Sequence, residues 1–250
     1  MQYHLDTIPV WEAMEWKREC PLCGLQHKTE LEEAERTFGA SVMEPSERIK
    51  VNQKGICVVH HQMLFGMQNR LGHALLMDSH GKEQLSRVTQ LQKTLRNNNG
   101  RRRAWFAKRE GQASLIGALQ TMDMECVICE RIAQHMARYR YTFLHLWKND
   151  AAFRDAWASS KGVCLPHLRQ LLTTAQQQLS AKDQEAFAAE GLAHLVDALT
   201  LDSQDLEWFT RKFDYRNQDQ PWGNSKNALE RTVNRLRGYA IGEAPCPPKR

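Results

Sequence analysis

Long apolar runs are missing from this sequence, and so is any segment that resembles a secretory leader. The first twenty residues contain no apolar stretch after a basic start, and no segment approaches the roughly 18 apolar residues of a membrane-spanning helix. We therefore expect a cytoplasmic protein. Because cytoplasmic thiols are kept reduced, the seven cysteines are expected to bind metal or carry redox chemistry rather than to form structural disulfides.

Strand patterns are also missing. Alternating β-branched and aromatic runs closed by Asn-Gly turns do not occur, and no proline lies between Pro45 and Pro166, as long helices require. Apolar residues recur instead at helical spacing, for example at Ile128, Ile132 and Met136. The sequence predicts an all-α protein, a helical bundle with short connections.

Common catalytic motifs are absent as well. The sequence contains no P-loop, no Rossmann glycine fingerprint, no His-Glu-x-x-His and no Gly-x-Ser-x-Gly. The net charge of +5 is a mild basic bias that permits acidic partners without requiring them. These features favour a binding or structural role over an enzymatic one.

Two cysteine motifs, in contrast, each occur twice. Glu19–Cys23 (ECPLC) returns as Glu125–Cys129 (ECVIC), and Lys54–His60 (KGICVVH) returns as Lys161–His167 (KGVCLPH). The offset is 106 residues for the first motif and 107 for the second. So regular a recurrence predicts an internal duplication.

The predicted repeats divide the chain at the Asn-rich turn before Gly100. Residues 1–99 form the first metal-binding helical repeat, and 100–250 form the second. The second repeat carries a C-terminal extension, with a loop over 213–223, a helix over 224–240 and a disordered tail that contains Cys246. Within each repeat we expect a long helix, a break, a short helix and then the Gly-x-Cys-x-x-His motif.

Each repeat contains the four ligands of one tetrahedral metal site. Two residues between the ligands of a motif let both side chains reach one ion, and a helix start adds N–H groups that stabilise a thiolate. Four protein ligands leave no open position, so we expect structural sites. The predicted ligand sets are Cys20, Cys23, Cys57 and His60 in the first repeat, and Cys126, Cys129, Cys164 and His167 in the second.

Residues beside the ligands support this assignment. Gly55 and Gly162 each lie two residues before a cysteine, where a tight turn favours a residue that tolerates positive φ. Three thiolates and a neutral imidazole around a dication carry a net charge of −1. Lys54 and Lys161 are placed to offset this charge, although ordinary solvated lysines are an equal alternative.

The identity of the metal is open at this point. Two zinc ions are the default for Cys₃His sites. One or two iron–sulfur clusters are the alternative, since such clusters favour thiolates and tolerate a histidine. Thioredoxin-type chemistry needs a strand-to-helix context, and attached haem needs a histidine after the second cysteine, where Gly24 and Glu130 stand.

Two weaker patterns point to possible binding surfaces. A basic stretch with interleaved aromatic residues could contact nucleic acid, or it could be a solvated helix start. A polar and aromatic loop could carry function, or it could close the bundle by docking. The residues concerned are Arg101, Arg102, Arg103, Lys108 and Arg109 in the stretch, and Asp214, Arg216 and Trp222 in the loop.

The chain resembles an uncharacterised bacterial family known as a domain of unknown function. The resemblance rests on the opening His4–Ala13, on both cysteine motifs, on Gly39–Pro45 and on the loop Phe213–Gly223. It covers nearly the whole chain and implies a bacterial cytoplasmic origin, but it carries no activity or catalytic residue.

Taken together, the sequence predicts a cytoplasmic helical protein with two structural metal sites that recognises an unknown protein or nucleic-acid partner, with no membrane contact. An iron–sulfur redox or sensor protein is the first alternative. An enzyme that uses the loop at 213–223 is the second.

Overall fold

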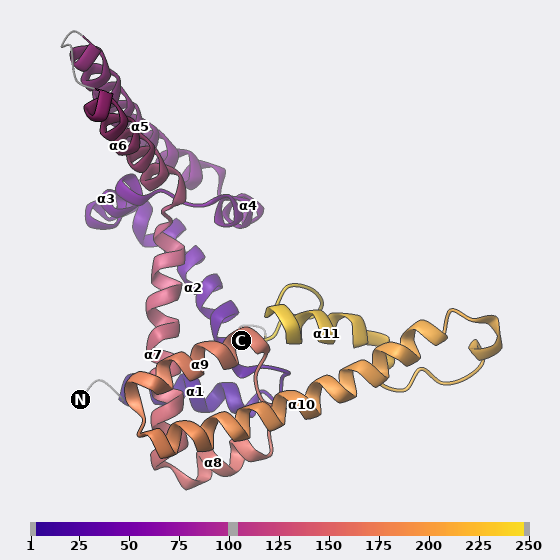
Figure 1. The fold of residues 1–250 in the computed structure, drawn as a ribbon. Coiled ribbons are helices and arrows are strands. Elements are labelled where there is room, and N and C mark those ends of the chain that lie inside the picture. The colour runs from indigo at the N-terminus through magenta and orange to yellow at the C-terminus, as the bar shows by residue number, and fades with distance from the viewer. Residues whose placement is uncertain (1–3, 100–104, 248–250) are drawn as a thin grey trace. The chain divides into compact units, whose positions relative to one another are not determined.

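The computed structural model describes residues 4–99 and 105–247, and every regular element within these ranges is a helix (Figure 1). The prediction of an all-α protein is confirmed. No helix in the described ranges combines the length and the apolar character needed to cross a membrane.

The helices follow one another with short connections. The first five are α1 (His4–Glu15), α2 (Pro21–Met43), α3 (Pro45–Lys54), α4 (Val58–Gly66) and α5 (Arg70–Asn99). The next five are α6 (Trp105–Met124), α7 (Val127–Asn149), α8 (Ala151–Ala158), α9 (Leu165–Gln178) and α10 (Ala181–Arg211). Two short 3-10 helices, η1 (Tyr215–Asn217) and η2 (Ser225–Asn227), precede the last helix α11 (Ala228–Arg237).

The element order agrees with the predicted duplication, which stays a prediction. Helices α2 and α7 each have 23 residues, and each is followed by a short helix, a motif helix and a long helix of 30 or 31 residues. The break after α2 lies at Pro45, which begins α3, and the break after α7 lies at Asp150, whose side chain caps α8.

The chain forms two compact units whose boundaries differ from those of the predicted repeats. The first unit combines Met1–Thr29 with Gln134–Arg250, and the second unit is Glu30–Ala133. The divisions fall inside α2 and α7, so each of these helices belongs to both units. Each unit is therefore assembled from segments of both repeats.

Aromatic side chains fill the core of the first unit. Phe143, Phe153, Trp157 and Phe187 are almost fully buried. Phe143 meets Phe153 and Trp157 edge to face at centroid distances of 5.1 and 5.3 Å, a geometry that aromatic quadrupoles favour. Helices α7 to α10 pack around this core, which therefore positions the start of α9.

The second unit has a smaller aliphatic core that lies next to a cysteine motif. Val51, Leu64, Leu76 and Ile128 are fully buried in it. Cys126 belongs to the same buried cluster, so this core is continuous with a predicted ligand. Packing of α3 to α5 against the start of α7 thus builds the surroundings of that ligand.

The loop at 213–223 is ordered by hydrogen bonds to Lys212 at the end of α10. Lys212 is 5% exposed, and its Nζ donates to the carbonyls of Asn217, Gln218 and Gln220 at 2.5–2.7 Å. The same Nζ lies 5.3 Å from the Trp222 ring centroid. These bonds order the loop locally, while Phe213 and Tyr215 are 73% and 79% exposed, so docking of the loop against the bundle stays a prediction.

The end of the chain differs from the predicted disordered tail. The structure describes it as far as Pro247, and Cys246 is buried. The carbonyl of Pro245 lies 2.8 Å from the position that a Cβ on Gly24 would take. The absence of a side chain at Gly24 therefore lets the tail lie against the first turn of α2.

Candidate metal centres

The structure gathers all eight predicted ligands into two clusters, but it corrects their pairing. Cys20, Cys23, Cys164 and His167 form one cluster, called here the α2/α9 centre, and Cys57, His60, Cys126 and Cys129 form the other, the α7/α4 centre. The predicted pairing within each repeat is wrong. Instead, the Cys-x-x-Cys motif of each repeat meets the Cys-x-x-His motif of the other repeat, and each centre lies within one unit.

Helix lengths explain the exchange. The 23 residues of α2 carry the chain about 35 Å from the cysteines at its start, whereas the 10 residues of α3 recover only about 15 Å even if α3 runs straight back. The same holds for α7 and the 8-residue α8. The Cys-x-x-His motif of a repeat therefore forms at the far end of that repeat's long helix, where the other repeat's cysteines lie.

The helix-start placement of the motifs is confirmed. Cys57 and Cys164 are the N-cap residues of α4 and α9, and Cys20 and Cys126 directly precede α2 and α7. A cluster of thiolates at helix starts gains from the backbone N–H groups that point toward it.

The glycine turn before each Cys-x-x-His motif also has the expected conformation. Gly55 and Gly162 both have φ of 72°, a value that residues with a Cβ rarely adopt. The Gly55 carbonyl accepts a hydrogen bond of 3.1 Å from the Val127 backbone N–H. This bond ties the two motifs of the α7/α4 centre together.

In the α2/α9 centre, all four ligands are buried and closely spaced. The Sγ atom of Cys164 lies 3.7 Å from that of Cys20 and 3.6 Å from that of Cys23. The Nδ1 atom of His167 lies 3.1–3.5 Å from the three sulfurs. No ligand side chain of this centre is more than 6% exposed.

The α7/α4 centre has the same spacing but is partly open. The Cys57 and Cys129 sulfurs are 3.8 Å apart, and the His60 Nδ1 lies 3.2–3.4 Å from all three sulfurs. His60 and Cys126 are buried, Cys57 is half-buried and Cys129 is exposed. The two centres therefore differ in access rather than in geometry.

These distances fit a single tetrahedral ion. Bonds of about 2.3 Å to sulfur and about 2.0 Å to nitrogen place the sulfurs about 3.8 Å from one another and about 3.5 Å from the nitrogen. All four ligand atoms of each centre lie within 4.8 Å of one another. Both centres are thus able to hold a metal ion.

The outer nitrogen of each ligand histidine faces a different residue. The Nε2 of His167 lies 3.2 Å from the amide oxygen Oε1 of Gln26, and the Nε2 of His60 lies 3.2 Å from the carboxylate oxygen Oε1 of Glu30. Such partners orient a ligand imidazole and adjust its basicity, and a carboxylate does so more strongly than a neutral amide.

Lys54 and Lys161, which occupy corresponding positions of the two motifs, bind carboxylates. Lys161 Nζ lies 2.6 Å from Glu19, and Lys54 Nζ lies 2.5 Å from Glu130. Each lysine thereby links its own motif to a residue adjoining the Cys-x-x-Cys motif of the other repeat. These pairs are largely exposed, so their contribution to stability is small.

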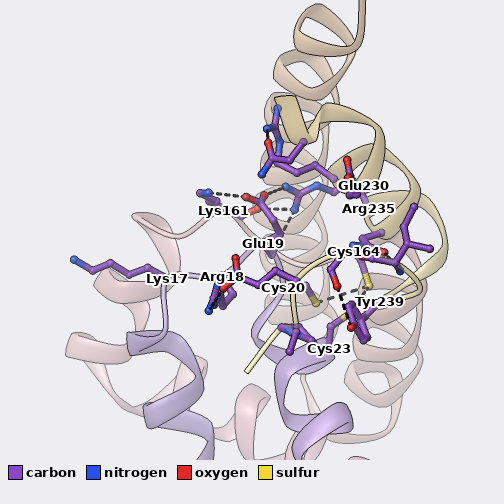
Figure 2. A pocket seen from close by; sticks show the side chains of 18 residues that line it. Lys17, Arg18, Glu19, Cys20, Cys23, Lys161, Cys164, Glu230, Arg235 and Tyr239 are labelled. Carbon is purple, nitrogen blue, oxygen red and sulfur yellow. Dashed lines mark hydrogen bonds and ion pairs between the residues drawn. The ribbon is translucent and has the colours of Figure 1, made fainter. Parts of the chain in front are cut away.

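A buried arginine joins both motifs of the α2/α9 centre. Arg235 of α11 is 3% exposed and donates to the backbone carbonyls of Glu19 and Lys161 at 2.9 and 3.2 Å. It also binds the Glu19 carboxylate at 2.5 Å and that of Asp202 at 3.3 Å. Figure 2 shows Arg235, Glu19 and Lys161 together at the rim of a pocket of about 400 Å³ whose wall includes the three thiols.

The lowered pKa of the Cys126 thiol favours cation binding at the α7/α4 centre. Burial raises the pKa of the Cys126 thiol, but hydrogen bonds from His60 and from the backbone of Cys129 and Cys57 outweigh burial and lower the pKa to about 6. Burial lowers the pKa of His60, yet its contacts with Cys126 and Glu30 raise that pKa to about 10. Both shifts favour a deprotonated Cys126 thiol and a protonated His60 imidazole, and a metal ion binds the imidazole only in its neutral form.

The other predicted binding residues do not join a centre. Asp214 and Arg216 are bonded to each other, with Arg216 Nη2 2.6 Å from Asp214 Oδ2. Trp222 packs beside Phe209 at a centroid distance of 5.8 Å. In the basic stretch, Arg101, Arg102 and Arg103 lie outside the described residues, as do the side chains of Lys108 and Arg109 in α6.

Sequence reasoning missed the residues around the ligands. Glu19 was detectable, because a glutamate precedes the Cys-x-x-Cys motif in both repeats. Gln26, Glu30 and Arg235 had no such signal. Each of them contacts a residue far away in the sequence, namely His167, His60 and Glu19, and none occupies a position that the two motifs share.

Comparison with known proteins places the chain in one family. No curated protein and no solved structure matches the chain. One family model, described as a family of unknown function, matches residues 1–243. The chain therefore belongs to the family of unknown function DUF6062.

Proposed function

We propose that this protein holds two structural zinc ions, one in each centre, and uses the resulting helical scaffold to recognise a partner in the cytoplasm. The observation that carries the proposal is the pair of four-ligand clusters with the edge lengths of a single tetrahedral ion. Zinc is the most common metal for three thiolates and one imidazole in such a geometry.

The same distances favour a single ion over an iron–sulfur cluster. A cluster places several iron and sulfide atoms between its ligands and so spreads the thiolates farther apart. Sulfur separations of 3.6–3.8 Å in both centres support one ion rather than a cluster in each. A redox or sensor protein built on a cluster is therefore the weaker alternative.

A structural role follows from how the ligands are connected. The α2/α9 centre links residues 141–147 positions apart in the chain, and the α7/α4 centre links residues 66–72 apart. A metal that closes such long loops removes much of the entropy of the unfolded chain. Four protein ligands also leave no coordination position for a substrate or water.

Metal analysis of the purified protein tests the zinc proposal. We expect a colourless protein with two equivalents of zinc, and loss of helix on treatment with a strong chelator. A brown protein with iron and acid-labile sulfide would contradict it. Retention of full helix content after both metals are removed would contradict the structural role.

Partner recognition rests on surface features and is the broader part of the proposal. The net charge is +5. The short helix α4 exposes three large apolar side chains, those of Val58, Val59 and Phe65, and grouped exposed apolar side chains are typical of a surface that binds a partner. A protein or a nucleic acid is a partner of suitable chemistry. The enzyme alternative gains no support, because Asp214 and Arg216 bond to each other.

Binding to short RNA and DNA duplexes at low salt separates the two partner classes. If the basic residues contact phosphates, affinity should fall by roughly one log unit per log unit of salt for each phosphate neutralised. Replacement of Arg101, Arg102 and Arg103 by serine should then reduce that slope. If the protein binds neither RNA nor DNA at low salt, the expected partner is a protein.

A further inference from the structure

One ligand stands apart from the other seven in its exposure. Cys129 is exposed, whereas every ligand of the α2/α9 centre, together with His60 and Cys126, is buried. Its neighbour Cys57 is half-buried. A thiolate reacts with dissolved electrophiles only where they can reach the sulfur, so access concentrates any such reactivity at Cys129.

The difference in access has a structural cause. The C-terminal extension covers the α2/α9 centre, since a backbone hydrogen bond from Tyr239 reaches Cys23 and Pro245 lies against Gly24. Arg235 closes the same side through Glu19. The extension follows the second repeat and has no counterpart after the first, so nothing equivalent covers Cys129 in the described part of the second unit.

A second thiol is placed to complete a reaction at Cys129. The Cys57 sulfur lies 3.8 Å from the Cys129 sulfur, and a disulfide bond requires about 2.05 Å. Oxidation of the Cys129 sulfur weakens its bond to the ion, which lets the Cys57 sulfur close that gap. Cys126 is a poorer second thiol, because it is buried in the apolar core, whereas Cys57 is half-buried.

We infer that Cys129 is an oxidation site for peroxides, that Cys57 resolves the oxidised product, and that the α7/α4 centre thereby releases its metal while the α2/α9 centre keeps its own. The inference rests on the proposed zinc sites. It adds a reactive role to one of two centres that share the same ligands.

The chemistry balances with hydrogen peroxide as the oxidant. The Cys129 thiolate attacks one peroxide oxygen, the O–O bond breaks, and a sulfenic acid forms as the other oxygen leaves as hydroxide, which takes a proton to become water. The Cys57 thiolate then attacks the Cys129 sulfur and displaces a second hydroxide, which becomes water in the same way. Two thiolates lose two electrons to one peroxide, and the ion left with only Cys126 and His60 dissociates.

The experiment treats the zinc-loaded, full-length protein with hydrogen peroxide and follows zinc release with a coloured chelator. Metal content is measured first. We expect one equivalent to be released at least about tenfold faster than the other, because the rate follows access to the thiolate. Digestion and mass spectrometry at the end of the fast phase should find a disulfide between the peptides that contain Cys57 and Cys129.

Two variants sharpen the test. Cys57→His keeps four donor atoms but removes the resolving thiol, so dimedone should label Cys129 as a trapped sulfenic acid. Cys246→Ser removes the buried cysteine outside both centres and should leave the fast phase unchanged.

Each outcome is decisive. Fewer than two zinc equivalents before oxidation would overturn the proposed function. Two equivalents released at one rate, a first disulfide that involves Cys126 or a cysteine of the α2/α9 centre, or a fast phase lost in Cys246→Ser would overturn this inference and leave the zinc sites standing.

Discussion

The two metal centres have the same ligands in the same motifs, yet their surroundings differ. The α2/α9 centre is buried beside α11 and the chain end, whereas the α7/α4 centre leaves Cys129 in contact with solvent. Ligand chemistry is thus repeated, while access is decided by a segment that occurs once. The comparison teaches that a duplicated metal motif acquires distinct properties from what packs over it.

A second difference concerns charge. The ligand histidine of the α2/α9 centre faces the neutral amide of Gln26, and that of the α7/α4 centre faces the carboxylate of Glu30. In addition, the buried Arg235 bonds to both motifs of the α2/α9 centre. The more open centre is therefore the one whose histidine is the more strongly polarised.

The largest expected effect comes from removing one ligand of each centre. Cys164→Ser and Cys57→Ser should each reduce bound zinc from two equivalents to one and lower the free energy of unfolding by on the order of 5 kcal/mol, because a structural zinc contributes folding free energy. The loss should be greater for Cys164→Ser, since Cys164 is 1% exposed. Elemental analysis and urea unfolding measure both quantities. Equal stability of parent and variants would mean that the metals are not structural.

The next largest effect is expected from Arg235 and concerns the buried α2/α9 centre alone. Arg235→Met leaves the buried carboxylate of Asp202 without one of its two arginine partners, so we expect a loss of about 3–5 kcal/mol and faster zinc release from the α2/α9 centre only. The matched control is Arg237→Met, an exposed position of the same helix. Similar effects of the two substitutions would contradict a clamp role for Arg235.

Exchanging the outer partners of the histidines tests the charge difference. Glu30→Gln should weaken zinc binding at the α7/α4 centre by about tenfold, and Gln26→Glu should strengthen it at the α2/α9 centre, because a carboxylate raises the basicity of a ligand imidazole. Competition with a chelator of known affinity gives both constants. If both substitutions leave the constants unchanged, the outer partners only orient the rings.

The smallest expected effect is an acid sensitivity specific to the second unit. The hydrogen bond from Lys50 outweighs burial and, together with the nearby Arg131, holds the pKa of the Glu47 carboxyl below its ordinary value. A lowered pKa stabilises the folded state above the unfolded pKa of 4.5, and this contribution is lost as pH falls through the folded value.

Glu47→Gln should therefore reduce stability near neutral pH and flatten its decline below about pH 4.5. Urea unfolding of parent and variant across that range measures the difference, and Glu44→Gln, at an exposed site nearby, is the control. Parallel curves for parent and Glu47→Gln would show that this carboxylate contributes nothing to acid sensitivity.

Local patterns in the sequence were enough to predict the all-α class, the eight clustered Cys and His residues and the conformation at Gly55 and Gly162. Each of these depends on local rules: helical spacing of apolar residues, two residues between ligands, and a turn that needs positive φ. Such patterns survive in any arrangement of the segments, which is why they were predictable before the fold.

Which motifs meet depends on how the helices fold together. The two Cys-x-x-His motifs are alike, so the local sequence does not distinguish Cys57 from Cys164 as the partner of Cys20. The length of α2 makes that choice, because a helix of 23 residues carries the second motif of its own repeat beyond reach of the first. The contacts of Arg235, the partners Gln26 and Glu30, and the burial of Cys246 depend on segments brought together across the chain, a relation that spacing along one chain does not encode.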